Sequence, residues 1–256
     1  MISLTTQLLL LRRWMLKNLI PEWYWPKTIL VDGVEIKIRN TPYSFGTRWL
    51  LRKGLYESEE RALIMEILQP GMHVLEMGGS IGIVTAVMAN IVGTKGKLIT
   101  VEASKTLSTY SRQWLCNFGN VTVVTGYAFP VWHAPKIDIN NFEQATGSLG
   151  GTLKFKIDAH GQNFATNDSS LYDIQRLCHE FDLKPNVLVV DVEGSEILMS
   201  TQTLNFPDTI KSVVIELHDW LYPRGRLDED NIHTSFLHDG FALHRRVANV
   251  CLYTRN

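Results

Sequence analysis

The feature that most constrains the fold is an unbroken apolar run, Val187–Val190, which ends abruptly in acidic residues. Asp191 and Glu193 follow the run directly, and Gly194 comes next. An apolar run without polar alternation is typical of a strand buried on both faces, as in a parallel sheet covered by helices. Because open α/β sheets bind ligands at the carboxyl ends of their strands, the two acids are candidates for a functional site.

The rest of the chain alternates between strand and helix patterns. We expect strands at 73–76, 97–101, 121–124, 187–190 and 212–216, and helices at 58–68, 81–91 and 107–118. Repeated β-α-β units predict a parallel sheet with right-handed crossovers. Only three residues separate the last two expected strands, 241–246 and 250–253, so these must form an antiparallel hairpin at one edge. The prediction is therefore an α/β fold with a mostly parallel, seven-stranded sheet.

The chain of 256 residues fits one large α/β domain with additions. We expect residues 1–57 to form an extension containing a helix and a β-hairpin, and residues 58–256 to form the α/β domain. The hairpin is indicated by Asp32-Gly33 between two β-prone runs. Residues 130–168 interrupt the β-α rhythm with several Asn and Gly residues, which predicts an inserted loop or hairpin on the substrate side.

The first residues of the chain have leucines at helical spacing over 3–19. Their apolar run ends at Arg12 and is too short to span a bilayer, which takes about 20 apolar residues. We expect this helix to dock on the domain or on a second copy of the chain, giving a homo-oligomer. Peripheral membrane contact is an alternative, because Arg12, Arg13 and Lys17 are basic.

Composition limits the partners and the compartment. The chain has 25 Lys and Arg against 26 Asp and Glu, a formal net charge of -1, so we expect no nucleic-acid partner. The three cysteines, Cys116, Cys178 and Cys251, are scattered and have no metal-ligand spacing. This pattern favours reduced thiols and a cytoplasmic location.

A second cluster of functional candidates surrounds a glycine-rich turn. One expected strand ends in Glu76, and Gly78, Gly79, Ser80 and Gly82 follow before a helix begins. Glycines allow a tight turn and a close approach of the backbone to a ligand. The spacing differs from that of dinucleotide-binding turns and places a carboxylate where a pyrophosphate would be repelled. A cationic ligand such as S-adenosylmethionine tolerates that charge, and an NAD(P)-dependent oxidoreductase is the alternative.

An acid at the end of the next strand supports a nucleoside ligand. Glu102 lies 20 positions after Gly82. A carboxylate at this place accepts hydrogen bonds from the two ribose hydroxyls of an adenosine. Ala103 beside it and Ala128 after the third strand are expected to border the bound nucleoside.

Taken together, these motifs resemble the FkbM-type S-adenosylmethionine-dependent methyltransferases over roughly residues 45–255. The motifs that carry the resemblance are the glycine turn after Glu76, Glu102, Asp191–Glu196 and Ile215–His218. The resemblance implies a class I methyltransferase (Rossmann-like) fold and S-adenosyl-L-methionine as the cofactor. The chain departs from the family at Glu76, Gly79 and Ser80, where Asp and an Ala-Asn pair are usual. A cofactor-binding protein without activity is therefore a further alternative.

The expected reaction is O-methylation of a hydroxyl on a small molecule or a glycan. The methyl donor is already activated, so the protein must align the reactants and accept the proton of the hydroxyl. We expect His218 to be the general base, because imidazole titrates near neutral pH, and Glu216 to orient it. Asp191 and Glu193 would position the acceptor or the amino group of the cofactor. A rival assignment makes Asp191, Glu216 and His218 ligands of a divalent ion, but we expect no metal.

Overall fold

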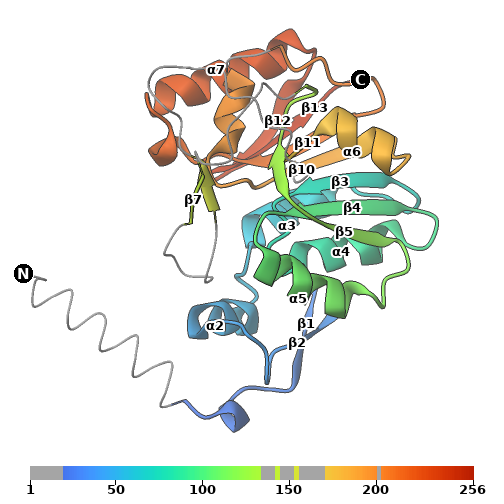
Figure 1. Cartoon of the computed structure of the whole chain (residues 1–256), viewed down its shortest axis with the longest axis vertical. Coiled ribbons are helices and arrows are strands. Elements are labelled where there is room, and N and C mark those ends of the chain that lie inside the picture. The colour runs from blue at the N-terminus through green and yellow to red at the C-terminus, as the bar shows by residue number, and fades with distance from the viewer. Residues whose placement is uncertain (1–19, 134–141, 145–152, 156–170, 201–202) are drawn as a thin grey trace, which may run out of the picture. The chain divides into compact units, whose positions relative to one another are not determined.

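A computed structural model describes residues 20–133, 142–144, 153–155, 171–200 and 203–256 (Figure 1). The helix expected at 3–19 lies outside these residues, as does much of the region 130–168. Within the described part of the chain, no helix is long and apolar enough to cross a membrane. The chain divides into two compact units, with the boundary between Ser58 and Glu59.

The first unit contains a β-hairpin and one regular helix. Its elements are η1 (Glu22–Tyr24), β1 (Thr28–Val31), β2 (Val34–Lys37) and α2 (Phe45–Lys53), and β1 pairs with β2 in antiparallel register. Asp32 and Gly33 have φ angles of 44° and 85°, the left-handed pair that an Asp-Gly hairpin turn requires. The hairpin prediction is therefore confirmed. Helix α2, which was not expected, begins after Ser44, whose hydroxyl accepts a hydrogen bond from the Thr47 amide.

The second unit is built around the predicted seven-stranded sheet. Its strands are β3 (His73–Met77), β4 (Lys97–Glu102), β5 (Val121–Thr125), β10 (Val187–Val190), β11 (Ser212–Glu216), β12 (Ala242–Val247) and β13 (Val250–Thr254). The spatial order is β12-β13-β11-β10-β3-β4-β5, and β13 runs antiparallel to both of its neighbours. The other neighbouring pairs are parallel. This is the class I methyltransferase sheet with its antiparallel C-terminal pair, so the fold prediction is confirmed.

Helices cover the sheet on two faces, each with its own apolar core. The helical elements are α3 (Ser58–Ile67), α4 (Ile83–Val92), α5 (Lys105–Leu115), α6 (Ile174–Glu180), η3 (Ser195–Ser200), η4 (Asp219–Leu221) and α7 (Arg226–His238). Leu75 and Met77 of β3 belong to the same core as apolar side chains of α6 and α7. Val74, which alternates with them, lies in the core formed with α3 and α4. Alternate residues of a buried strand therefore pack into the cores on opposite faces of the sheet. Because both faces are apolar, the strands appear in the sequence as continuous apolar runs.

The region after β5 contains two small ladders. Strand β6 (Tyr127–Phe129) pairs in parallel with β9 (Leu171–Asp173), and β7 (Phe142–Gln144) pairs antiparallel with β8 (Leu153–Phe155). The β6–β9 ladder was not expected. The ladder brings the residues that follow β5 next to those that precede α6, because Ala128 pairs with Tyr172. Both ends of the intervening segment therefore start close to Ala128. That this segment contacts the substrate stays a prediction.

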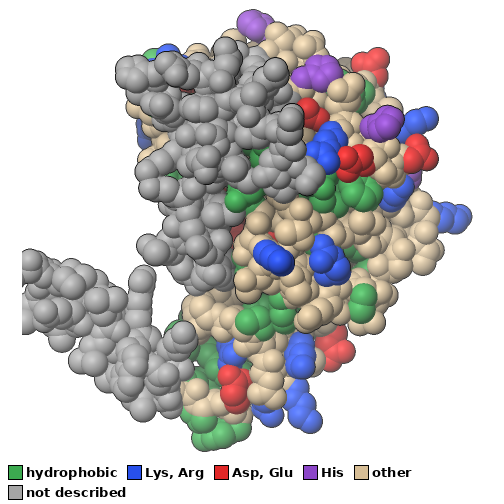
Figure 2. Space-filling model, in the orientation of Figure 1, with side chains coloured by type: hydrophobic (Ala, Val, Ile, Leu, Met, Phe, Trp, Pro, Cys, Tyr) green, Lys and Arg blue, Asp and Glu red, His purple; other side chains and the backbone are tan. Residues whose placement is uncertain are grey.

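Charged side chains are mixed on the surface. Figure 2 shows one face of the molecule, on which basic and acidic side chains are interspersed. Edge strand β12 illustrates the mixing, because Arg245 pairs with Glu66, and Arg246 with Glu229. The absence of a nucleic-acid partner stays a prediction that agrees with this mixture.

Candidate active site

The glycine turn after β3 is fixed by close packing against neighbouring strands. Gly78 has a φ angle of 96°, and a Cβ atom there would lie 1.6 Å from the carbonyl oxygen of Asp191. At Gly79 a Cβ atom would lie 2.0 Å from Oγ1 of Thr100. These glycines were expected to let a ligand approach the backbone. At Gly78 the protein's own backbone packing excludes a side chain, whereas a Cβ atom at Gly79 would require the Thr100 side chain to move.

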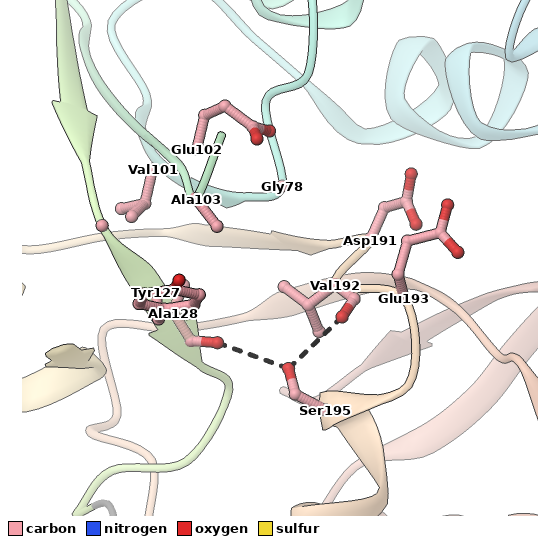
Figure 3. Close-up of a pocket in the computed structure, with 11 residues that line it drawn as sticks. Gly78, Val101, Glu102, Ala103, Tyr127, Ala128, Asp191, Val192, Glu193 and Ser195 are labelled. Carbon is pink, nitrogen blue, oxygen red and sulfur yellow. Dashed lines mark hydrogen bonds between the residues drawn. The ribbon is translucent and has the colours of Figure 1, made fainter. Parts of the chain in front are cut away.

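One pocket brings together most of the predicted residues at the carboxyl ends of β3, β4, β5 and β10 (Figure 3). The predicted residues that line it are Gly78, Glu102, Ala103, Ala128, Asp191 and Glu193. Gly126 and Tyr127, which precede Ala128 and are expected with it to flank the adenine, also line the pocket. The sequence did not indicate the remaining lining residues as site residues; they are Val101, Val192 and Ser195. The hydroxyl of Ser195 donates to the carbonyl of Ala128 at 3.3 Å and so joins the turn after β10 to β6. Its place inside the acidic motif was the only signal for it in the sequence.

Glu102 is held rigidly at the end of β4. Its Oε2 accepts the amide proton of Ser80 at 2.8 Å, and its Oε1 accepts that of Ser104 at 2.6 Å. Burial raises the pKa of Glu102, although the two amide donors act in the opposite direction. A carboxylate has about four acceptor sites, so two remain for the hydroxyls of a ligand. Ser80 therefore contributes through its backbone amide, by fixing Glu102.

Glu76 does not line the pocket. Its side chain lies on the α4 side of the sheet, where the Thr85 hydroxyl donates to Oε2 at 2.6 Å. Burial raises the pKa of Glu76 to about 7, since the charged form loses its hydration. The expectation that this carboxylate faces the cationic end of a ligand is not supported by its position. Gly79, Ser80 and Gly82 are likewise not among the residues that line the pocket.

His218, which follows β11, is oriented by Glu196. Its Nδ1 lies 2.5 Å from Oε1 of Glu196, and its backbone amide donates to the same oxygen at 3.1 Å. The Glu196 side chain is fully buried, and its Oε2 accepts the amide proton of Gly194 at 2.7 Å. The expectation that Glu216 orients His218 is therefore wrong. A fully buried carboxylate with three such bonds fixes the ring far more tightly than a strand-end side chain could.

The other ring nitrogen of His218 faces carboxylates. Nε2 lies 3.6 Å from Oδ1 of Asp191 and 4.0 Å from Oε2 of Glu193. Burial alone would lower the pKa of His218, but the hydrogen bond to Glu196 and the charges of Glu196, Glu216 and Glu193 raise it to about 9. The ring is not among the residues that line the pocket. The role of His218 as general base stays a prediction.

Asp191 and Glu193 line the pocket together with Glu102, and the carboxylates of Asp191 and Glu193 point in the same direction (Figure 3). Glu193 has a φ angle of 49°, in the left-handed region that a non-glycine residue seldom adopts. Such a conformation costs on the order of 1 kcal/mol and is concentrated at functional sites. The turn thus presents both acids on one side. Asp191 also belongs, with Glu216 and His218, to the described group that could hold a metal ion.

The strand order and the pocket define a class I methyltransferase fold with its site where the order reverses, between β3 and β10. Residues 58–129 match the family model of protein-L-isoaspartate(D-aspartate) O-methyltransferase. The protein-L-isoaspartate O-methyltransferase of Methanothermobacter thermautotrophicus is 45% identical over 69 residues, which are 25% of this chain. The match spans 32% of that relative, about a third of its length. The segment 58–129, which the family model matches, contains the glycine turn and Glu102, whereas Asp191 and His218 lie outside it.

Two solved methyltransferase structures are similar to this chain at low sequence identity. A TehB-like methyltransferase from Corynebacterium glutamicum has a TM-score of 0.42 and 13% identity, with coverage of 83% of this chain and 96% of that one. Fibrillarin from Aeropyrum pernix has a TM-score of 0.43 and 11% identity, with coverage of 93% and 86%. The fold assignment rests on the strand order of this chain.

Proposed function

We propose that this chain is an S-adenosylmethionine-dependent methyltransferase that transfers the methyl group to an oxygen atom. The observation that carries the proposal is the pocket at the reversal of strand order, where Gly78, Glu102 and Asp191 meet. The sequence match over 58–129 contains the cofactor side of this pocket, which supports the same cofactor.

The hydrogen-bond acceptors of the pocket fit this cofactor. Glu102 has acceptor capacity left for the ribose hydroxyls, and Ala103 and Ala128 leave space for the flat adenine ring. Asp191 offers a carboxylate to the amino group of the methionine part. When bound, S-adenosylmethionine supplies a methyl group on a positively charged sulfur, and the acceptor oxygen forms its bond to carbon as the carbon–sulfur bond breaks. The residues of this chain align the two reactants and exclude water.

The acceptor side favours a neutral hydroxyl, as on a small molecule or a glycan. Asp191 and Glu193 line the pocket, and these two carboxylates would repel an anionic acceptor. Either carboxylate can instead take the proton that a hydroxyl loses. The FkbM-type resemblance also supports a hydroxyl acceptor. Its most specific motif, Asp191–Glu196, lies outside residues 58–129, the segment that matches the protein-L-isoaspartate(D-aspartate) O-methyltransferase model.

A second candidate acceptor is a protein carboxylate, since the matching family and the archaeal relative are both named for carboxyl methylation. A carboxylate needs no deprotonation, so this reaction would use the pocket acids only for positioning. The two products differ in stability: a methyl ester is hydrolysed at alkaline pH, whereas a methyl ether is stable.

The test combines binding with transfer. Calorimetry on the full chain with S-adenosylmethionine, its demethylated product, NADH and NAD is expected to show binding of the first two only. Transfer of a radiolabelled methyl group is then assayed on hydroxylated small molecules, glycans and isoaspartyl peptides, followed by alkaline treatment. Binding of NADH without S-adenosylmethionine would overturn the proposal in favour of an oxidoreductase. Binding without transfer to any acceptor would favour a protein that has lost its activity.

A further inference from the structure

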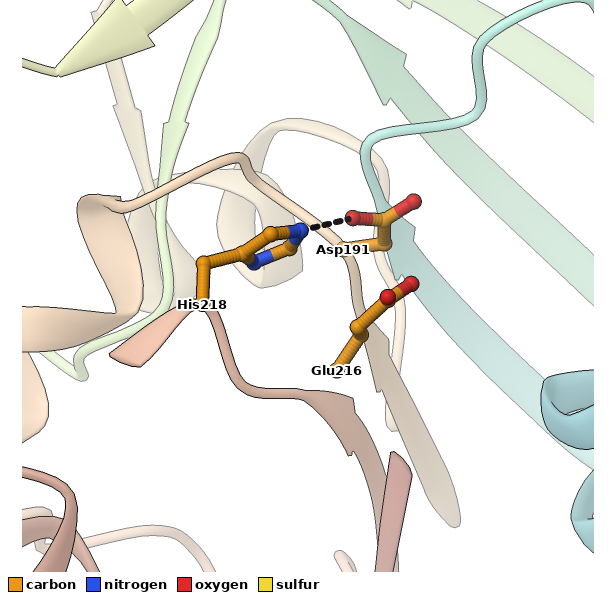
Figure 4. A group of neighbouring side chains, drawn as sticks. All are labelled: Asp191, Glu216 and His218. Atoms are coloured by element: carbon orange, nitrogen blue, oxygen red, sulfur yellow. Dashed lines mark ion pairs between the residues drawn. The ribbon is translucent and has the colours of Figure 1, made fainter. Parts of the chain in front are cut away.

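Three side chains from two neighbouring strand ends converge on one point, and one of them, Asp191, also lines the pocket. Asp191 follows β10, while Glu216 ends β11 and His218 lies two residues later. One ligand atom from each of the three lies within 4.8 Å of those of the other two. Figure 4 shows the carboxylates of Asp191 and Glu216 next to each other, with the imidazole of His218 turned toward them.

The distances suit ligand atoms arranged around an ion better than direct bonds among them. His218 Nε2 lies 3.6 Å from Oδ1 of Asp191, which is longer than a hydrogen bond. Protein ligands lie about 2.0–2.6 Å from divalent ions, so two ligands of one ion are separated by about 3–5 Å. The observed separations fall in this range.

The second nitrogen of His218 provides an independent indication. Nδ1 lies 2.5 Å from Oε1 of Glu196, so Nε2 is the ring nitrogen turned into the three-residue group, where a bound ion would take the place of its proton. Metal-binding histidines usually donate their other ring N–H to a carboxylate, which fixes the tautomer and the ring orientation. Glu196, whose side chain is fully buried, occupies this position for His218.

The local charge is also strongly unbalanced. Four carboxylates, of Asp191, Glu193, Glu196 and Glu216, surround one imidazole. A divalent cation would offset this repulsion, which is strong because the surroundings are partly buried.

We propose that Asp191, Glu216 and His218 bind a divalent first-row cation, with Mn²⁺ as the best match. Carboxylate ligands suit Mg²⁺ and Mn²⁺, whereas imidazole favours transition metals, so a set with both types points to Mn²⁺. The use of the ion rests on the proposed function. Beside the pocket it polarises an acceptor hydroxyl and lowers the hydroxyl pKa, which leaves Glu193 to take the proton.

The experiment measures Mn²⁺ binding to the full chain after removal of metals with a chelator, by calorimetry and electron paramagnetic resonance. Electron spin-echo modulation on the wild-type chain is expected to show coupling to a ¹⁴N nucleus from His218. Glu216→Gln is expected to weaken Mn²⁺ binding at least tenfold, on the scale of losing one charged ligand. Glu35→Gln, at an exposed position of the hairpin, is the matched control and is expected to leave binding unchanged.

The outcomes separate this proposal from the proposed function. Failure to bind Mn²⁺, or bound Mn²⁺ without the ¹⁴N signal, overturns the metal site even if S-adenosylmethionine binds. Unchanged Mn²⁺ affinity in Glu216→Gln also overturns it. Binding of Zn²⁺ but not Mn²⁺ at the same residues overturns the choice of metal. Loss of S-adenosylmethionine binding alone would instead count against the proposed function.

Discussion

The two sides of the site are stabilised in different ways. On the cofactor side, Glu102 has its two oxygens bonded to backbone amides, and Gly78 is packed tightly against the next strand. On the proposed acceptor side, the carboxylates of Asp191, Glu193 and Glu216 lie close to His218. The first side is fixed by backbone hydrogen bonds and backbone packing. The second is a cluster of charged side chains whose electrostatic energy depends on what binds there. Substitutions should therefore affect cofactor affinity or stability on one side, and turnover on the other.

The largest expected effect is on turnover and comes from Asp191→Asn. The change keeps the shape of the side chain but removes the charge that faces the reaction, which should lower kcat about 10²–10⁴-fold. Methyl transfer from labelled S-adenosylmethionine measures it, once an acceptor is known. Glu35→Gln is the control and should have wild-type activity. Turnover within twofold of wild type in Asp191→Asn would show that the two sides do not differ as described.

The next effect is on stability and comes from Gly78→Ala. The new Cβ would lie 1.6 Å from the Asp191 carbonyl oxygen, and the φ angle of 96° disfavours any side chain. Overpacking and backbone strain together should lower the free energy of unfolding by about 3 kcal/mol or more. Urea denaturation gives the value. Gly119→Ala is a matched control, because a Cβ at Gly119 meets nothing within 4 Å, and it should change stability little.

Glu76→Gln is expected to change how the free energy of unfolding depends on pH. The pKa of Glu76 is about 7 in the folded chain against 4.5 as the ordinary value, so the folded state holds the proton more tightly. The stability that this proton provides is complete below about pH 4.5 and is lost as pH rises through about 7. The neutral variant should therefore gain up to about 3 kcal/mol over wild type between pH 4.5 and pH 8. An equal difference between the two chains at both pH values would contradict this account.

The sheet could be predicted from the sequence because its signals are local. The runs Val187–Val190 and Ser212–Glu216 form strands with the predicted bounds, since buried parallel strands are continuously apolar. The Asp-Gly turn likewise defined its hairpin. Helix α2 was missed because it is only nine residues long. The β6–β9 ladder was missed because it joins segments far apart in the chain.

The site was predictable in its members but less so in their roles. Glu102, Asp191 and Glu193 were found because strand ends of a parallel sheet meet at one edge. The partner of His218 could not be found in this way, because Glu196 lies 22 positions away and reaches the ring through the tertiary fold. The direction of the His218 pKa shift follows from that contact and from the acids around it, and no local pattern contains it.

The smallest expected effect is on cofactor affinity and comes from Glu102→Gln. Glu102→Gln keeps one acceptor for the amides of Ser80 and Ser104 but loses the second and the negative charge. Affinity for S-adenosylmethionine should fall about tenfold, on the scale of one charge-assisted hydrogen bond of about 1.5–3 kcal/mol. Ser104→Ala is the matched control, because it removes the helix cap hydroxyl and leaves the amide that binds Glu102. It should lower stability by about 1 kcal/mol without changing affinity. If both variants lost affinity equally, the rigidity of the turn, rather than the Glu102 carboxylate, would determine cofactor binding.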